Sequence, residues 1–214
     1  MKDLSDYRKS YEKNELIETS IPETPIDLFQ KWFLEMENLN GEEEVNAMSV
    51  ATLGLDGFPK TRVVLLKKYD QDGFVFYTNY ESEKGKAIAE NPKVCLSFFW
   101  QKLERQVIIK GVCEKLAELA SDQYFESRPK GSQLGAIVSN QSQVITSRSV
   151  LENSLQELEN QFKDKPILRP ENWGGFLVRP LEIEFWQGRP NRLHDRIRYQ
   201  LQKDYSWRIE RLSP

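Results

Sequence analysis

The sequence contains very little histidine or cysteine and has no long apolar run. One histidine and two cysteines occur in 214 residues, with no zinc-ligand spacing, Ser-His-Asp set, Walker loop or G-x-G-x-x-G motif. These absences argue against a metal site, a triad hydrolase and a common nucleotide-binding fold. No segment is long and apolar enough to span a membrane, and residues 1–20 lack the apolar core of a signal peptide. We therefore expect a cytoplasmic protein with no membrane partner.

An excess of basic residues is also missing. The formal net charge is −3, so binding to nucleic acid is not expected. Hydrophobic residues make up 39% and charged residues 29% of the chain, which is typical of a soluble globular protein. Cys95 and Cys113 lie in apolar segments and are expected to be buried free thiols in a reducing compartment.

The hydrophobic pattern predicts a charged, mobile arm over residues 1–20 and a single domain over residues 21–214. Gly41 is expected to end the first helix, and Ser82 and Ser132 are expected to cap later ones. Helices are predicted at 25–39, 84–90, 120–127, 133–138 and 149–162. Strands are predicted at 47–53, 58–68, 74–78, 94–100, 106–116, 175–186, 192–200 and 205–212. Short strands with irregular helices between them favour a mainly β fold, an antiparallel barrel with peripheral helices.

The segment Trp186–Arg198 concentrates positive charge in an otherwise acidic protein. Arg192, His194, Arg196 and Arg198 follow one another at spacing two. On a β-strand this spacing places all four side chains on one face. Cations in a row repel each other unless an anionic or electron-rich group lies against them, so this face is expected to meet a ligand. The neighbouring arginines should lower the pKa of His194 and favour a neutral imidazole near pH 7.

An apolar strand segment, Thr61–Lys68, carries a cation near each end. Arg62 and Lys67 are five residues apart, so a regular strand points them to opposite faces. A site that uses both side chains therefore requires a bulge or a bend. A barrel strand with solvated ends is the alternative interpretation.

Two predicted helix starts offer donors for a phosphate. Ser82 precedes a first turn that contains Lys84, where unpaired amides favour an anion. Tyr124 and Arg128 share a helix face, and Ser132 begins the next helix. A phenol, a guanidinium and a hydroxyl would then converge on a small anion. An ordinary capped surface helix and a plain helical corner are the alternatives.

These segments occur in the same order in a known family. The strings are R-V-V-L-L-K, F-Y-T-N, K-G-K, E-R-Q-V, Y-F-x-S-R-P-x-x-S-Q-x-G-A, S-x-Q-S, W-G-G-F and E-F-W-Q-G-x-x-x-R-L-H-D-R. Together they closely resemble the pyridoxamine 5′-phosphate oxidase family, and the terminal R-L-S-P resembles that family's ending. The resemblance extends over residues 25–214. Each string alone is weak, but their number and order are specific.

The resemblance implies a homodimeric, FMN-binding split β-barrel with the flavin between the subunits. It implies oxidation of pyridoxamine 5′-phosphate and pyridoxine 5′-phosphate to pyridoxal 5′-phosphate, with dioxygen as acceptor and hydrogen peroxide as product. The positions that match FMN-binding residues are Arg62, Val63, Val64, Leu65, Leu66, Lys67, Tyr77, Thr78, Lys84, Gln106, Gln141, Ser142, Trp186 and Arg196. The positions that match substrate-binding residues are Lys67, Tyr124, Arg128, Ser132, Arg192 and His194, with Arg192 and His194 as catalytic candidates. Arg8 and Tyr11 match a segment that can fold over the site.

One position departs from the family pattern. The family commonly reads S-R-K-G, with the arginine on the FMN phosphate, where this chain has Glu83. A carboxylate beside a dianion is unfavourable. We therefore expect Glu83 to turn toward solvent and FMN to bind somewhat more weakly than in relatives that carry the arginine.

Three other functions are compatible with parts of this pattern. A carrier of flavin or pyridoxal phosphate would need no second phosphate pocket, which argues against it. A split-barrel reductase using deazaflavin or another acceptor is disfavoured by the R-L-H-D-R segment. A purely structural interaction module does not account for the concentrated cations of the C-terminal segment.

Overall fold

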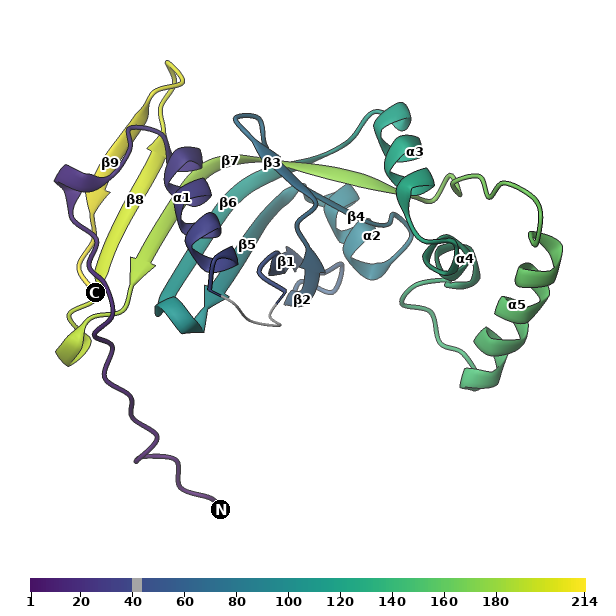
Figure 1. Cartoon of the computed structure of the whole chain (residues 1–214), viewed down its shortest axis with the longest axis horizontal. Coiled ribbons are helices and arrows are strands. Elements are labelled where there is room, and N and C mark those ends of the chain that lie inside the picture. Colours follow the sequence, from purple (N-terminus) through teal and green to yellow (C-terminus); the bar gives the residue numbers. More distant parts are fainter. Residues whose placement is uncertain (40–43) are drawn as a thin grey trace. The chain divides into compact units, whose positions relative to one another are not determined.

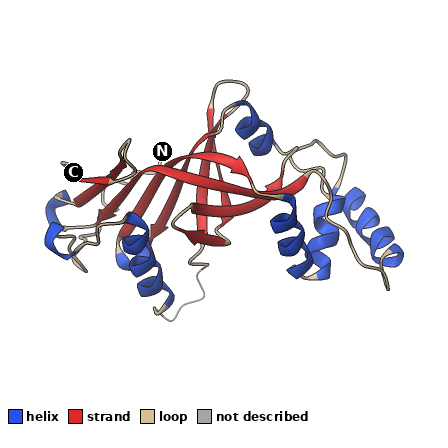
Figure 2. Cartoon of the chain, turned by 90° about the horizontal axis from the view of Figure 1, so that it is seen from above, coloured by secondary structure: helices blue, strands red, loops and turns tan. Residues whose placement is uncertain are grey.

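Strands dominate the computed structural model, which describes residues 1–39 and 44–214 (Figure 1, Figure 2). Gly41, which we expected to end the first helix, lies outside the described residues. The helices are α1 Pro25–Glu37, α2 Glu83–Glu90, α3 Glu118–Ser127, α4 Lys130–Val138 and α5 Arg148–Gln161. Short 3-10 turns are η1 Glu18–Ser20, η2 Gln101–Leu103 and η3 Pro190–Arg192. The strands are β1 Ala47–Leu53, β2 Pro59–Leu65, β3 Lys68–Asp70, β4 Gly73–Asn79, β5 Lys93–Trp100, β6 Arg105–Lys115, β7 Trp173–Gln187, β8 Asp195–Leu201 and β9 Trp207–Arg211.

The strands form one sheet in the order β2-β1-β5-β6-β7-β4-β3, and β8 pairs with both β7 and β9. The pairs β3–β4, β4–β7, β7–β8 and β8–β9 are antiparallel. The chain divides into two compact units. Unit 1 comprises Met1–Val50, Cys95–Gly111 and Pro180–Pro214, and unit 2 comprises Ala51–Val94 and Val112–Arg179. The division into a mobile arm and one domain stays a prediction.

Helix α1 supplies much of the core of unit 1. It begins after Thr24, whose side chain accepts a hydrogen bond from the Asp27 amide, and Pro25 occupies its first turn. Its apolar residues recur at helical spacing, so one face is buried. Phe29 packs on Phe98 at 5.2 Å between ring centroids, and Trp32 packs edge-on against Phe185 at the same distance. Burying each such aromatic side chain stabilises the fold by about 1.5–3 kcal/mol.

The prediction of four cationic side chains on one strand face is wrong. Strand β8 begins at Asp195, because Asn191 and Arg192 adopt left-handed backbone conformations with φ of 57° and 62° after Pro190. Only Arg196 and Arg198 lie on the strand. Their charges are met by carboxylates of this chain: Arg196 Nε lies 2.7 Å from Glu184, and Arg198 Nη2 lies 2.5 Å from Glu210.

Unit 2 contains the bend that a shared role of Arg62 and Lys67 requires. The predicted strand over residues 58–68 is interrupted, since β2 ends at Leu65 and β3 begins at Lys68. Leu66 is buried, and the Lys67 amide donates to the Val75 carbonyl at 2.8 Å. The chain therefore turns between the two strands while its backbone stays paired.

The corner between α3 and α4 differs from the prediction at Ser132. We expected Ser132 to cap α4, but the helix begins at Lys130 with Pro129 as its N-cap. The proline ring holds φ at −53°, and the Pro129 carbonyl accepts hydrogen bonds from the Ser132 amide at 2.8 Å and the Gln133 amide at 3.1 Å. The helix therefore starts three residues earlier, and Ser132 lies in its first turn.

Beneath this corner lies a small hydrophobic cluster of unit 2, formed by Phe125, Leu134, Ile167 and Trp173. Leu155, Leu158 and Phe162 from the predicted apolar side of α5 pack against it. Val150, which we placed on the same side, is 44% exposed because it lies in the first turn of α5, away from the cluster.

Both cysteines are free thiols, with Cys113 buried and Cys95 half-buried. Burial raises the pKa of Cys113 to about 12, so this thiol stays protonated and unreactive. Among the described residues, no helix combines the length and the apolar character needed to cross a membrane.

Candidate functional site

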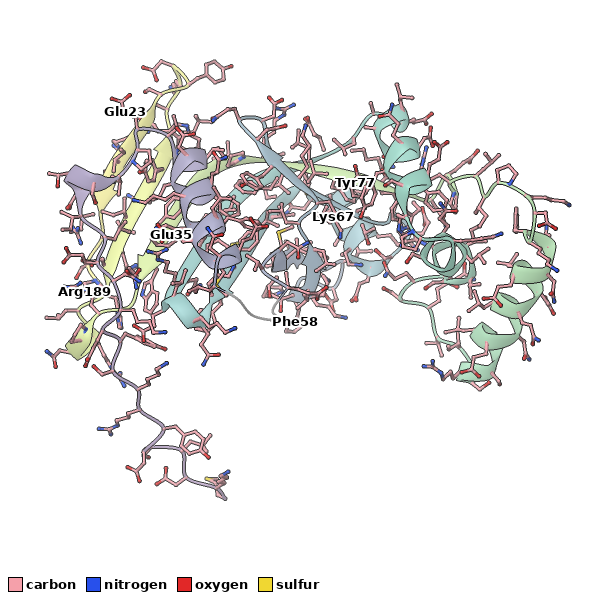
Figure 3. The ribbon with its side chains drawn as sticks, in the orientation of Figure 1. Glu23, Glu35, Phe58, Lys67, Tyr77 and Arg189 are labelled. Carbon is pink, nitrogen blue, oxygen red and sulfur yellow. The ribbon has the colours of Figure 1, made fainter. Side chains whose placement is uncertain are left out.

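A cavity of about 910 Å³ lies within unit 2. Its wall is formed by β2, the bend at Lys67, β4, the start of α2, the α3–α4 corner and the loop after α4 (Figure 3 labels Lys67 and Tyr77). Most of the predicted site residues of unit 2 line it. They are Arg62, Val63, Val64, Leu65, Lys67, Tyr77, Thr78, Lys84, Tyr124, Arg128, Ser132, Gln141 and Ser142. The volume is sufficient for a cofactor-sized aromatic ligand.

One end of the cavity is built around a buried lysine. Ser82 caps α2 by accepting from the Gly85 amide, and Lys84 follows in the first turn. Lys84 Nζ donates to Gln141 Oε1 at 2.9 Å and to Thr78 Oγ1 at 3.1 Å. Burial, reinforced by the nearby charge of Arg62, lowers the pKa of Lys84 to about 8. A lysine held in this way, at the N-terminal end of a helix, suits an anionic group.

Two further cations, Arg62 and Lys60, border this end of the cavity. Arg62 Nη1 donates to Thr52 Oγ1 at 2.7 Å, and burial lowers the pKa of its guanidinium. Glu83 is exposed, as expected, but it is also paired, because Lys60 Nζ lies 2.7 and 2.6 Å from its two carboxylate oxygens. The amide of Glu83 also donates to Ser142 Oγ at 3.2 Å. Lys60 thus compensates the charge that the sequence placed next to an expected phosphate.

The α3–α4 corner presents a guanidinium over a set of parallel rings. Tyr77 and Tyr124 stack with centroids 3.8 Å apart, and Trp173 lies parallel to Tyr124 at 6.2 Å. The Arg128 Cζ atom lies 4.5 Å from the centre of the Trp173 ring. Among the described residues, no atom accepts a hydrogen bond from the buried Arg128 Nη1. Burial lowers the pKa of this guanidinium, and such a donor is costly unless an anion binds there.

The remaining predicted site residues belong to unit 1, except Leu66, whose buried side chain is not among those that line the cavity. Trp186, His194 and Tyr11 form a ring cluster, with centroids 4.6 Å apart for Trp186–His194 and 5.8 Å apart for Tyr11–Trp186. His194 Nδ1 accepts the Arg189 amide at 3.1 Å, so the proton of the neutral imidazole resides on Nε2. Burial, with the charge of Arg192 second, lowers the pKa of His194 in the predicted direction.

Tyr11 lies in a segment of the arm that is bonded to unit 1. Glu104, which is buried, accepts hydrogen bonds from the Glu12 amide at 2.9 Å and the Lys13 amide at 3.2 Å. A side chain at Gly188 would come within 2.8 Å of Tyr11 Cβ, so glycine lets the tyrosine approach. Arg8 bonds only within the arm among its described contacts, from Nε to the Ser5 carbonyl.

Two other predicted residues of unit 1 are occupied by contacts within the chain, and a third is exposed. Gln106 donates to Ser97 Oγ at 3.4 Å, and Arg196 is held by Glu184. Arg192 is exposed at the end of η3. Their predicted roles toward FMN and substrate stay predictions.

Two residues that shape the cavity, Lys60 and Trp173, were not predicted from the sequence. Trp173 lies inside the W-G-G-F string, where its stacking with Tyr124 and Arg128 could not be inferred from spacing. Lys60 lies two residues before Arg62, so on a strand the two side chains point to the same face. This spacing was the signal in the sequence that Lys60 lines the same cavity as Arg62.

Comparison with known proteins identifies the family. The profile described as "Pyridoxamine 5'-phosphate oxidase" matches residues 36–162, and that described as "Pyridoxine 5'-phosphate oxidase C-terminal dimerisation region" matches residues 173–214. A curated protein of Flavobacterium johnsoniae, named pyridoxine/pyridoxamine 5′-phosphate oxidase, is 70% identical over 213 residues and covers 100% of both chains.

Solved structures show the same fold. A Burkholderia lata protein, PhzG, crystallised with tetrahydrophenazine-1-carboxylic acid, aligns with a TM-score of 0.86 at 27% identity over 93% of this chain and 98% of its own. A pyridoxamine 5′-phosphate oxidase-related, FMN-binding protein of Nostoc punctiforme aligns with a TM-score of 0.71 at 16% identity over 91% and 100% of the two chains, and shows the fold alone. The predicted mainly β, split-barrel fold with peripheral helices is confirmed. The chain belongs to the pyridoxamine 5′-phosphate oxidase family.

Proposed function

We propose that this protein is an FMN-dependent oxidase that converts pyridoxamine 5′-phosphate and pyridoxine 5′-phosphate to pyridoxal 5′-phosphate. Dioxygen is the electron acceptor and hydrogen peroxide is a product with both substrates; with pyridoxamine 5′-phosphate, water is consumed and ammonia leaves as well. The observation that carries the proposal is the presence of two separate cationic sites in one cavity, at Lys84 and at Arg128. Two phosphorylated aromatic molecules, a cofactor and a substrate, account for both sites. The names of the curated relatives support the same substrates.

FMN fits the end of the cavity formed by β2, α2 and the loop after α4. Lys84 and Arg62 supply positive charge, while Thr78, Gln141 and Ser142 supply hydroxyl and amide groups for hydrogen bonds. We propose that Gln106, Trp186 and Arg196 of unit 1 also bind the flavin. When bound, FMN supplies the redox chemistry, accepting electrons from the substrate and passing them to dioxygen.

The substrate phosphate fits the corner formed by Tyr124, Arg128 and Ser132, with Lys67 as an additional cation on the cavity wall. Holding the phosphate there orients the pyridine ring, so that much of the catalytic effect comes from positioning. We propose Arg192 and His194 as the catalytic side chains, because His194 Nε2 carries a proton that it can donate to a polar group of the substrate. Arg8 and Tyr11 of the arm would contact the substrate as well.

We further propose that the protein is a homodimer with FMN at the subunit interface. The match of residues 173–214 to a dimerisation region supports this assembly. A cytoplasmic location is proposed, because both cysteines are free thiols as expected in a reducing compartment.

The function is tested with purified protein and added FMN. We expect a yellow protein that consumes dioxygen and releases hydrogen peroxide with pyridoxamine 5′-phosphate and pyridoxine 5′-phosphate, and far less with unphosphorylated pyridoxamine. An oxygen electrode measures the consumption of dioxygen, and a peroxidase-coupled assay measures the hydrogen peroxide that is released. A protein that binds FMN without any oxygen uptake is a carrier, and one that binds no FMN contradicts the proposal altogether.

Glu83→Arg should lower the dissociation constant of FMN several-fold. The substitution removes a carboxylate from the cavity wall, frees Lys60 from its ion pair and adds a cation at the first position of α2. Titration of the apoprotein with FMN, followed by the loss of flavin fluorescence, measures the effect. Glu90→Arg makes the same charge change on an exposed residue at the other end of α2 and should leave FMN binding nearly unchanged. An equal or weaker affinity in Glu83→Arg contradicts the role given to this position.

A further inference from the structure

We infer that Gln133 is a positioning residue of the substrate-phosphate corner, in that its amide sets the direction of Arg128. The inference rests on the proposed function and deepens it. Gln133 lies in the first turn of α4, directly after Ser132, and is half-buried. Gln133 is not one of the described residues that line the cavity, so it acts through the residues that do.

The side-chain amide of Gln133 lies within hydrogen-bond distance of three carbonyl oxygens at the end of α3. Gln133 Nε2 lies 3.0 Å from the Phe125 carbonyl oxygen, 3.1 Å from that of Glu126 and 3.1 Å from that of Arg128. The last carbonyls of a helix have no partner inside the helix. The Gln133 backbone amide, in turn, donates to the Pro129 carbonyl at 3.1 Å. One residue therefore links the end of α3 to the beginning of α4.

This link decides where the three groups of the corner stand relative to one another. Tyr124 and Arg128 come from the end of α3, whereas Ser132 comes from α4 (Figure 1 shows the two helices in succession). Arg128 is the C-cap of α3 and has extended backbone, with ψ of 148°, so helical hydrogen bonding no longer holds its carbonyl. The hydrogen bond from Gln133 holds it instead, and the Arg128 side chain then reaches the face of Trp173.

The amide also changes the electrostatics of the corner. Carbonyl groups at the C-terminal end of a helix carry partial negative charge, which disfavours a bound phosphate. The neutral amide of Gln133 shares its two N–H groups among these three oxygens and adds no charge of its own. The Arg128 guanidinium therefore keeps an unpartnered donor for the substrate instead of turning back toward the helix end.

The test compares Gln133→Met with the FMN-loaded wild-type enzyme. Methionine has similar length and volume but no donor, so the Glu126 and Arg128 carbonyls lose the Gln133 amide, whereas the Phe125 carbonyl keeps the Arg128 amide at 3.2 Å. We expect KM for pyridoxamine 5′-phosphate to rise on the order of tenfold, with kcat changed less than about twofold and FMN affinity unchanged. Gln123→Met, at an exposed position of α3, is the matched control and should behave like the wild type. A fall in kcat at constant KM overturns the inference.

A binding measurement separates this inference from the proposed function. Dissociation constants for pyridoxal 5′-phosphate and for pyridoxal are measured on FMN-loaded protein by absorbance titration. The wild type should prefer the phosphorylated form strongly, and Gln133→Met should lose on the order of tenfold of that preference. No preference in the wild type overturns the phosphate corner itself. A full preference in both Gln133→Met and Gln133→Ala overturns only the role of Gln133, and Gln133→Ala is retained in case the methionine variant does not fold.

Discussion

Arg128→Ala should raise KM for pyridoxamine 5′-phosphate on the order of a hundredfold while FMN stays bound. The guanidinium has a buried Nη1 without an acceptor among the described residues, and it lies against Trp173. A phosphate would form charge-assisted hydrogen bonds with it, whose loss costs about 3 kcal/mol. Alanine removes this charge without touching Lys84 or Arg62 at the other end of the cavity. Steady-state kinetics with the flavin content recorded in parallel measures the effect.

Two controls sharpen the Arg128→Ala experiment. Arg148→Ala removes an arginine from the exposed start of α5 in the same unit, and its kinetics should equal those of the wild type. The stability of the apoprotein is informative as well. Since Arg128→Ala removes a buried donor that lacks a partner, the variant should unfold at a temperature close to that of the wild type. Loss of flavin with an unchanged KM would assign Arg128 to the cofactor instead.

FMN affinity should fall as the pH rises through about 8, and Lys84→Met should abolish this dependence. Burial and the charge of Arg62 lower the pKa of Lys84 to about 8, so in the apoprotein the ammonium loses its proton above that pH. An anionic phosphate binds the protonated form better, which means that binding takes up a proton in this range. We expect Lys84→Met to weaken FMN binding on the order of tenfold or more near pH 7. Lys86→Met, an exposed lysine of the same helix, is the control.

The same pKa shift of Lys84 makes the stability of the apoprotein depend on pH. The pKa of about 8 in the folded protein lies below the ordinary lysine pKa of 10.5, so between these two pH values the unfolded chain binds more protons than the folded chain. The contribution of Lys84 to the stability of the apoprotein should therefore rise with pH across this window. Urea unfolding of the wild type and of Lys84→Met at several pH values checks this. An identical pH slope in both proteins would show that Lys84 does not carry the shift.

Local patterns predicted most of the secondary structure, because helix caps and alternating apolar residues act over a few positions. Ser82 caps α2 as expected, and turns between strands occur at Gly57 and Gly73, where φ is positive. The errors arose where one local signal competed with another. A serine at 132 suggested a cap, but Pro129 already starts the helix. Basic residues at a spacing of two over residues 192–198 suggested a strand, but Arg192 belongs to the turn that begins at Pro190.

The site was predictable in its residue types but not in its pairings. The sequence alone indicated Lys84 and Arg128 as cations that could bind a phosphate, and in the structure both residues line the same cavity. It could not indicate that Lys60 neutralises Glu83, because these residues are 23 positions apart. Nor could it show the acidic partner of Arg196, which comes from the neighbouring strand β7. Such partners depend on strand register, which spacing within a single segment does not reveal.

Trp173 differs from the other tryptophans in where it stands. The five indoles of the chain are Trp32, Trp100, Trp173, Trp186 and Trp207, and only residue 173 falls within unit 2. A protein labelled with fluorotryptophan therefore gives one ¹⁹F resonance from that half of the chain. Because this ring lies against both the Tyr124 phenol and the Arg128 guanidinium, its chemical shift reports directly on the corner. Occupancy there can be followed in solution without an attached dye and without turnover.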